Sequence, residues 1–471
     1  MASQSDNDMT GHELTARLDR LSGWPYPIFV LWVIGVGYFM AFFDITNIAF
    51  GLPVFSKLFH MTAAQEAYPI SSSLFGYILG AWLNSNLADA VGRKLGIALA
   101  TILFSIGCLG STFSSSLESM VIWRFITGMG IGAEIAVIST YIGEIAPAPV
   151  RGRYTGWANV FSFVGLAIVP VVALVLVPNF VWGWRAMFLI GALGLVTLVA
   201  FPYLPESPRW LVGKRRYADA RAIIETAEQR VRQRTGWPLA QIGASVPETE
   251  VHGFPTAHLL RPPYVGRVLL LLALWCVWYI GEYAWLGLGP TFFVEHGYTL
   301  THSIVFMLMS SVGLPIGALL SAWLGDHFER KYAIFVGMII WIVSFLGIAF
   351  ITNSVTIYAS VFLLTAALGY VIPLMYTLTA ESFLTSARAT GVSLTDGIGH
   401  LGGAAGPVLA TMVYAWGGKS FGFEGVFIFI AATGLAAALI LPFSVSATGK
   451  PLELVSGHVE AVFLERVDIH D

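Results

Sequence analysis

Long apolar stretches recur along the whole chain and are separated by polar connections. Each has about 20 residues, which is the length that an α-helix needs to cross the hydrocarbon core of a bilayer. Twelve are found, at roughly 27–50, 67–88, 95–114, 119–142, 154–177, 185–204, 268–292, 303–325, 332–351, 355–380, 389–415 and 424–444. The pattern predicts an all-α membrane protein with twelve transmembrane helices.

The composition agrees with this prediction. Of the 471 residues, 56% are hydrophobic and 11% are charged, and a soluble protein of this size needs a more charged surface. The polar opening MASQSDNDMTGHELTARLDR shows neither the short apolar core nor the small-residue cleavage site of a signal peptide. Cys108 and Cys276 both fall inside apolar stretches, which argues against a disulfide scaffold.

The basic residues predict how the chain lies across the membrane. With the N-terminus in the cytoplasm, all 25 Lys and Arg fall in cytoplasmic segments except Lys57, Arg124, Arg185 and Lys419. This distribution satisfies the positive-inside rule. Because the number of spans is even, the C-terminus is expected in the cytoplasm as well. We expect a multi-pass protein of the plasma (inner) membrane.

One long polar segment divides the chain into halves. We expect a cytoplasmic tail over residues 1–26, a six-helix bundle over 27–204, a linker over 205–267, a second six-helix bundle over 268–444 and a cytoplasmic tail over 445–471. Within the linker, KRRYADARAIIETAEQRVRQR is typical of an amphipathic helix lying on the cytoplasmic face of the membrane.

The two halves contain an internal repeat of charged residues. The loop LADAVGRK recurs as LGDHFERK 237 positions later, and EIAPAPVR recurs as ESFLTSAR at the same offset. The charged members are Asp89, Arg93, Glu144 and Arg151 in the first half and Asp326, Arg330, Glu381 and Arg388 in the second. A shared offset predicts two pseudo-symmetric bundles related by an axis along the membrane normal.

These motifs resemble those of the major facilitator superfamily over nearly the whole chain. RFITGMGIGAE (124–134), YIGEIAPAPVRGRYTG (141–156) and PESPRWL (205–211) are similar to motifs of the sugar porters and of their relatives that carry organic acids, organic ions and nicotinate-like metabolites. The chain differs from the superfamily's usual pattern around the two repeated loops, where Ser85 and Glu329 stand at positions that usually hold glycine. The sugar porters' glutamines in spans five and seven and their PET-type motif after span twelve are absent, which favours the organic-acid side.

The resemblance implies a gating role for the eight repeated charges. They are expected to form ion pairs that latch the two bundles in the outward-open state, so that breaking them opens the cytoplasmic side. A purely structural belt of ion pairs is the alternative.

Asp44 is a single acid in the apolar run FFDITNIAF. An ionised carboxylate at mid-membrane depth costs about 2.5 to 3.5 kcal/mol even on lenient scales, so we expect it to face a cavity or a partner. Since burial favours the protonated form and a nearby cation the ionised form, such an acid can load and release a proton. The resemblance to the proton-coupled xylose symporter implies Arg124 as partner. A static buried ion pair remains the alternative.

Three further polar residues lie inside predicted spans. Glu134 lies ten residues beyond Arg124, about 15 Å deeper along the helix, as a second proton site or a cytoplasmic-side brace. Asp396 and His400 are spaced i to i+4, so they share a helical face. They are candidates for holding a proton or orienting a polar substrate, or else they make a packing hydrogen bond.

Glu282 in span seven is flanked by aromatic residues. Tyr279, Tyr283 and Trp285 are candidates for stacking on a flat ligand, or they belong to an aromatic belt at the membrane interface. A half-helix break is expected at Gly287, Gly289 and Pro290. Asn159 in span five completes the candidate substrate-binding set.

Other patterns are discounted. GMGIGA (128–133) lies inside an apolar helix with no preceding strand, and WGGKS (416–420) lacks the first glycine of a P-loop, so neither predicts a nucleotide site. His and Cys residues show no metal-ligand spacing. We expect no cofactor other than the proton gradient, no nucleic-acid partner and no enzymatic activity.

The sequence therefore predicts a monomeric secondary transporter that works with protons, the lipid bilayer and a small-molecule substrate. Proton symport of a small organic acid, nicotinate-like or another aromatic carboxylate, is favoured. A sugar or polyol transporter, a proton-coupled drug exporter and a non-transporting nutrient receptor are the alternatives.

Overall fold

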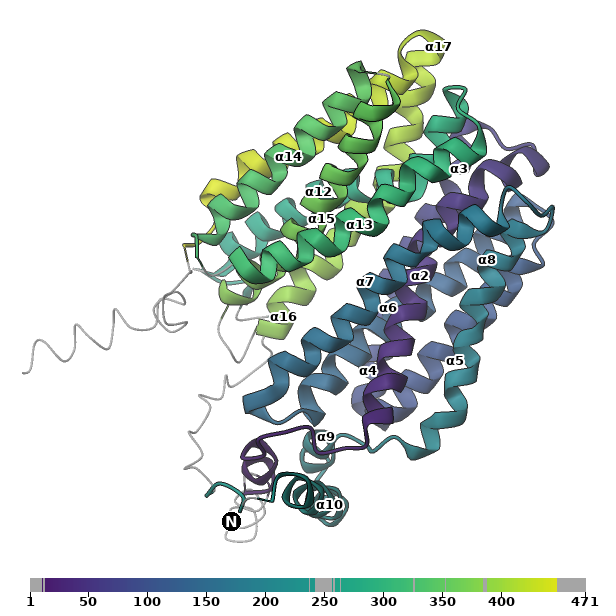
Figure 1. The fold of residues 1–471 in the computed structure, drawn as a ribbon. Helices are drawn as coiled ribbons and strands as arrows, with labels where there is room; N and C mark the ends of the chain where they lie inside the picture. Colours follow the sequence, from purple (N-terminus) through teal and green to yellow (C-terminus); the bar gives the residue numbers. More distant parts are fainter. Residues whose placement is uncertain are drawn as a thin grey trace, which may run out of the picture. The chain divides into compact units, whose positions relative to one another are not determined.

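The computed structural model describes residues 11–446 apart from residues 12, 237, 242–255, 257–258, 263, 325–326, 352 and 384–387. The described part is built from helices, without strands (Figure 1). The long helices of the first half are α2 (Ile28–Leu58), α4 (Tyr68–Val91), α5 (Arg93–Thr112), α6 (Leu117–Ile145), α7 (Arg151–Leu176) and α8 (Gly183–Ala192), which continues as η2 (Leu193–Tyr203). Those of the second half are α12 (Tyr264–Glu295), α13 (Leu300–Leu324), α14 (Arg330–Phe350), α15 (Ser354–Glu381), α16 (Arg388–Val392), η4 (Ser393–Gly397) and α17 (Ile398–Ile440), which ends in η5 (Leu441–Phe443).

Each of the twelve predicted spans coincides with a helix in the described residues. The eleventh and twelfth are joined in α17, which bends where Gly418 takes φ 58° and ψ −153°. Only glycine adopts this backbone conformation readily, so Gly418 marks the turn between the two spans. Among the described residues, ten helices are long and apolar enough to cross a membrane on their own. Two fall short: α4, which contains serines and asparagines, and the part of α17 before Gly418, which is rich in glycine.

The chain divides into two compact units. Unit 1 comprises Met1–Ile45, Phe75–Leu166 and Arg185–Pro247, and unit 2 comprises Thr46–Leu74, Ala167–Trp184 and Glu248–Asp471. The division passes through α2, α4, α7 and α8 and does not follow the predicted bundle bounds. The bounds of tails, bundles and linker therefore stay a prediction.

Close helix packing in unit 1 requires glycine within α6. A side chain at Gly130 would meet the backbone of Phe104 on α5. Small residues let two helix backbones approach, which strengthens dispersion contacts where lipid provides no hydrophobic driving force. The glycines of RFITGMGIGAE therefore serve packing in α6.

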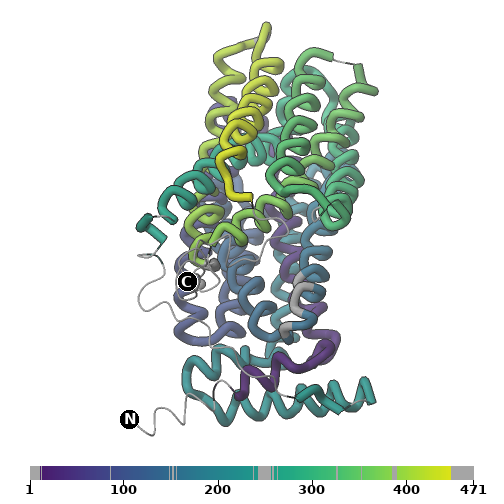
Figure 2. The backbone as a smooth tube through the Cα atoms, turned by 90° about the vertical axis from the view of Figure 1, so that its left-hand side faces the viewer, coloured from purple at the N-terminus to yellow at the C-terminus, as the bar shows by residue number. Residues whose placement is uncertain are grey.

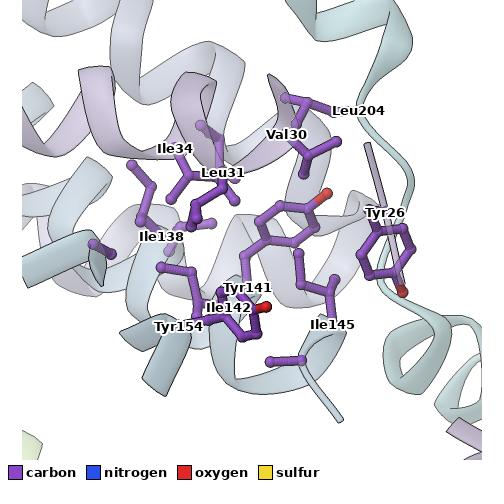
Figure 3. Packing of buried hydrophobic residues seen from close by; sticks show 14 of the residues in the cluster. Tyr26, Val30, Leu31, Ile34, Ile138, Tyr141, Ile142, Ile145, Tyr154 and Leu204 are labelled. Carbon is purple, nitrogen blue, oxygen red and sulfur yellow. The ribbon is translucent and has the colours of Figure 1, made fainter. Parts of the chain in front are cut away.

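An apolar cluster packs the N-terminal end of α2 against the C-terminal end of α6 in unit 1. Figure 3 shows the side chains that α2, α6 and the start of α7 contribute to it. Labelled there are Tyr26, Val30, Leu31, Ile34, Ile138, Tyr141, Ile142, Ile145, Tyr154 and Leu204. The Tyr141 hydroxyl donates a hydrogen bond of 2.5 Å to the carbonyl of Pro205. This contact fixes the start of the linker on α6.

The linker helix α10 (Tyr217–Thr235) is covered by protein on its apolar side, which the sequence did not predict. Its apolar stripe packs against the N-terminal segment, residues 11–21, and against α9 (Pro208–Gly213). The buried set is Leu14, Leu18, Leu21, Leu211, Ala220, Ile224, Ala227 and Val231. In Figure 2 the purple N-terminal segment runs beside the teal linker helices. The N-terminal leucines therefore bury the apolar side of α10, and the position of this helix on the cytoplasmic face of the membrane stays a prediction.

Ion pairs hold the N-terminal segment on α10. Glu228 accepts hydrogen bonds from Arg17 at 3.1 and 2.8 Å and from Arg20 at 2.5 Å. Asp19 accepts a bond of 2.5 Å from Arg209 on α9. Burial alone would raise the pKa of Glu228, but the bonds from the two arginines outweigh it and hold that pKa below its usual value.

Candidate transport site

Asp44 and Arg124 form an ion pair in the interior of unit 1. Arg124 Nη1 donates to Asp44 Oδ2 at 2.5 Å. The Asp44 side chain is 0% exposed and that of Arg124 is 1% exposed, so water screens neither charge. Removing two charges from water costs several kcal/mol each, and this pair is stable only while both partners are charged and bonded.

Two residues that the sequence analysis did not select surround this pair. The thiol of Cys108 on α5 donates to the other Asp44 oxygen, Oδ1, at 3.4 Å. The guanidinium of Arg124 lies 5.7 Å from the ring centroid of Phe188 on α8, in cation–π geometry. Cysteine and phenylalanine are ordinary in apolar helices, so only tertiary packing reveals these contacts.

Glu134 is a second buried acid in unit 1. It is 1% exposed, and its Oε1 accepts a hydrogen bond of 3.2 Å from the Thr101 hydroxyl on α5. Its Oε2 has no hydrogen-bond partner among the described residues. No basic side chain of the described part pairs with it. This environment suits a carboxylic acid that carries a proton better than an ionised one.

Asp396 lies at the centre of an aromatic group in unit 2. Tyr279 of α12 donates to its Oδ1 at 2.5 Å, and Tyr376 of α15 donates to the same atom at 3.1 Å. His400 Nδ1 is 2.9 Å from the backbone carbonyl of Asp396, as the i to i+4 spacing predicts. The Tyr279 and His400 ring centroids are 4.3 Å apart. The sequence analysis missed Tyr376 because the interior of its span contains no charged residue.

The other predicted substrate-binding residues do not all lie near Asp396. Tyr283 lies near this group, with its ring centroid 5.8 Å from that of His400, and Glu282 is 8% exposed on the same helix. Trp285, in contrast, packs against Phe345 at 5.3 Å in an aromatic core. Asn159 is exposed on α7 in unit 1. The aromatic residues of span seven therefore lie in two different environments, one near Asp396 and one in an aromatic core.

The predicted break in span seven is wrong. The helix α12 runs without interruption from Tyr264 to Glu295, with Pro290 inside it. Gly287 packs closely against Ile70, whose side chain would have to shift to admit a Cβ atom at 2.8 Å. A proline removes one backbone hydrogen bond, and neighbouring helices make this tolerable inside a membrane.

The repeated charges pair within each unit. In unit 1, Arg93 donates to Asp89 at 2.5 Å and to Glu144 at 2.7 Å. In unit 2, Arg330 donates to Glu381 at 2.7 Å. The same two types of residue, 237 positions apart, thus make the same contact. Asp326 and the side chains of Arg151 and Arg388 lie outside the described residues.

Glu206 of the motif PESPRWL extends this charged group. Its Oε1 accepts from the backbone N–H of Arg93 at 3.0 Å, at the N-terminus of α5, where a negative charge is favourable. Trp210 Nε1 donates to the carbonyl of Asp89 at 2.9 Å. The spacing of the motif alone does not predict which helix end Glu206 caps.

Among the described residues, no group of three His, Cys, Asp or Glu side chains is placed to hold a metal ion.

Comparison with known proteins identifies the class. The family model described as "Sugar (and other) transporter" matches residues 28–457, and the chain belongs to this family. A niacin transporter of Acinetobacter baylyi is 28% identical over 94% of this chain and 99% of its own length. A 4-hydroxybenzoate transporter of the same organism is 27% identical over 87% of this chain and 90% of its own. The protein is thus a multi-pass membrane transporter of small molecules and not an enzyme.

Solved structures confirm the predicted fold. A crystal structure of a D-xylose-proton symporter superimposes with a TM-score of 0.71 at 20% identity, covering 90% of this chain and 99% of that one. An inward open structure of the xylose transporter of Escherichia coli gives the same TM-score and identity, over 93% and 100%. The chain has the twelve-helix major facilitator fold.

Proposed function

We propose that the protein is a proton-coupled symporter that imports a small organic acid, either nicotinate-like or another aromatic carboxylate. The buried pair of Asp44 and Arg124 carries this proposal. Relatives that transport niacin and 4-hydroxybenzoate support the substrate class. The tyrosines around Asp396 offer ring faces and hydroxyls that suit a flat, polar ligand.

Asp44 is the proposed site of the transported proton. Its carboxylate is held by Arg124 and by the Cys108 thiol, and no solvent reaches it. Protonation removes the negative charge, so the guanidinium loses its partner while it is still desolvated. The free energy of that loss is available to drive a change in helix packing. Glu134, with its unbonded Oε2, is the proposed second proton site.

The repeated charges are the proposed cytoplasmic gate. Arg93 with Asp89 and Glu144, and Arg330 with Glu381, hold the cytoplasmic ends of α5, α6, α14 and α15. Arg151, Asp326 and Arg388 belong to the same proposed set. Opening the cytoplasmic side requires these ion pairs to rearrange. We place the transporter in the inner membrane as a monomer, with both termini in the cytoplasm.

Transport into proteoliposomes tests the coupling. A thermal-shift screen over carboxylates, sugars and amines first identifies a substrate for the purified full-length protein. Under an inward proton gradient the wild type should accumulate that substrate above equilibrium. The Asp44→Asn variant should lose accumulation but retain exchange of substrate across the membrane.

The matched control is Asp219→Asn, which makes the same chemical change at an exposed acid of α10. It should accumulate substrate as the wild type does. Accumulation by Asp44→Asn that follows the proton gradient would refute the coupling role of Asp44. Binding without any flux in the wild type would favour a receptor.

A further inference from the structure

One oxygen of Asp396 remains available. Both tyrosine hydroxyls bond Oδ1, and His400 Nδ1 approaches this same oxygen only to 3.9 Å. No hydrogen bond joins Oδ2 to the described residues. The Asp396 side chain is 14% exposed. The carboxylate is therefore oriented by its neighbours through one oxygen and can accept a ligand through the other.

A second acidic side chain lies next to Tyr283 on α12. Glu282 is 8% exposed, and its Oε2 lacks a hydrogen-bond partner within the described part of the chain. In that part no Lys or Arg forms an ion pair with Asp396 or Glu282. No ion pair with Lys or Arg therefore offsets the charge of an ionised Asp396, which disfavours a further anion in this poorly solvated region.

His400 contacts the backbone of Asp396. Its Nδ1 lies 2.9 Å from the backbone carbonyl of Asp396, and a carbonyl oxygen can only accept. Nδ1 therefore carries the hydrogen of that bond. The neighbourhood of Asp396 thus has acids and hydroxyls but no permanent cation among the described residues.

The aromatic rings supply a surface for positive charge. Tyr279 lies between Trp275, at a centroid distance of 5.0 Å, and Tyr283, at 5.5 Å. Tyr376 lies 4.8 Å from Trp275. The faces of such rings are electron-rich and attract cations that are delocalised or alkylated. A carboxylate beside them is a combination that fits a cationic nitrogen.

We propose that the substrate carries a positively charged nitrogen on its aromatic ring, bound by Asp396 Oδ2 among Tyr279, Tyr283 and Tyr376. This inference rests on the proposed function, because it narrows the organic acid to an aromatic zwitterion, with a cationic nitrogen besides its carboxylate. A simple aromatic carboxylate places only negative charge in this region and is disfavoured there.

Three ring compounds of similar size separate these possibilities. N-methylnicotinate has a fixed cationic nitrogen, nicotinate has a neutral ring nitrogen at pH 7, and benzoate has none. Isothermal titration of the full-length wild type in detergent gives the dissociation constants. We expect N-methylnicotinate to bind at least about tenfold more tightly than benzoate, with nicotinate between them.

The Asp396→Asn variant keeps an oxygen for the tyrosines but removes the negative charge. It should bind N-methylnicotinate about tenfold more weakly and bind benzoate no more weakly than the wild type does. The control Asp219→Asn should match the wild type for all three compounds. The comparison of compounds on the wild type needs no variant, so it remains decisive if Asp396→Asn does not fold.

The outcomes separate this inference from the function on which it rests. If benzoate or nicotinate binds as tightly as N-methylnicotinate, the cationic nitrogen is refuted and organic-acid symport stands. If no aromatic carboxylate of any kind binds but a sugar or a simple amine does, the proposed function fails together with it.

Discussion

Arg124 and Asp44 stabilise the fold only when both are present. Each partner has lost its hydration, so the stability that either contributes depends on the other being present. The Cys108 thiol and the Phe188 ring add weak contacts to the two charges. Single substitutions at this site are therefore expected to behave very differently from a double substitution.

Arg124→Gln should lower the free energy of unfolding by about 3 to 5 kcal/mol, because it leaves the Asp44 carboxylate buried without a cation. Combining it with Asp44→Asn should recover most of this loss, since two neutral amides of similar shape remain. Thermal unfolding of the purified variants in detergent measures both effects. Additive destabilisation in the double variant would contradict the pairing.

At the scale of elements, the start of α5 joins three features. Gly92 precedes the helix with φ 117°, Glu206 accepts the N–H of Arg93, and the Arg93 side chain pairs with Glu144. A side chain at Gly92 would collide with the Glu206 carboxylate. The helix end, the linker motif and the repeated ion pair therefore depend on one glycine.

Gly92→Ala should destabilise the protein by about 1 to 3 kcal/mol, because alanine does not adopt this backbone conformation without strain. The matched control is Gly143→Ala within α6, where an added methyl group meets nothing and helix propensity improves. Thermal unfolding should show a lower midpoint for the first variant and an unchanged or higher one for the second. Equal midpoints would mean that the loop before α5 relaxes freely.

Hydropathy predicted the helices well because each span must bury its backbone in lipid on its own, whatever its neighbours are. Even α4 was placed correctly, although its serines and asparagines make it too polar to qualify by apolarity alone. The turn at Gly418 and the continuous path through Pro290 depend on packing against other helices. Those features could not be read from a single span.

The site was predictable only in part, for a similar reason. Asp44, Asp396 and His400 attracted notice because a charge inside an apolar run is costly. Tyr376 and Cys108 carry no such cost, so only the folded arrangement shows that they bond those acids. Spacing predicted the contact of His400 with Asp396, since both lie on one helix, whereas pairs on different helices need a fold or a known relative.

At the scale of the whole molecule, the N-terminal segment and the linker helix α10 form one assembly within unit 1. Leu14, Leu18 and Leu21 cover α10, and Glu228 accepts bonds from Arg17 and Arg20. The linker is thereby tied to the N-terminus as well as to α5. A conformational change that moves the linker must carry the N-terminal segment with it or release it.

Acid should release the N-terminal segment. The pKa of Glu228 is lower in the folded protein than in the unfolded chain, where it is about 4.3. Its stabilising contribution is complete above the unfolded value and is lost as the pH falls through the folded one. Limited proteolysis after Leu18 or Leu21 should therefore be slow near pH 5 and accelerate below about pH 4.

The variants isolate this effect from the pH dependence of the protease. Glu228→Gln should be cleaved rapidly at both pH values, because the amide has no charge to lose. Glu225→Gln, an exposed neighbour whose oxygen is 4.0 Å from Arg17, should follow the wild type. The same profile for wild type and Glu228→Gln would place the acid-sensitive contact elsewhere.

The docking of the N-terminal segment on α10 also has a consequence for biosynthesis. Arg17 and Glu228 are 211 positions apart, so the opening leucines leave the ribosome long before their partner exists. The six hydrophobic helices of the first half are translated while the N-terminal leucines are still uncovered and accessible to chaperones. The leucines of this segment can therefore reach their final position only after α10 has been translated.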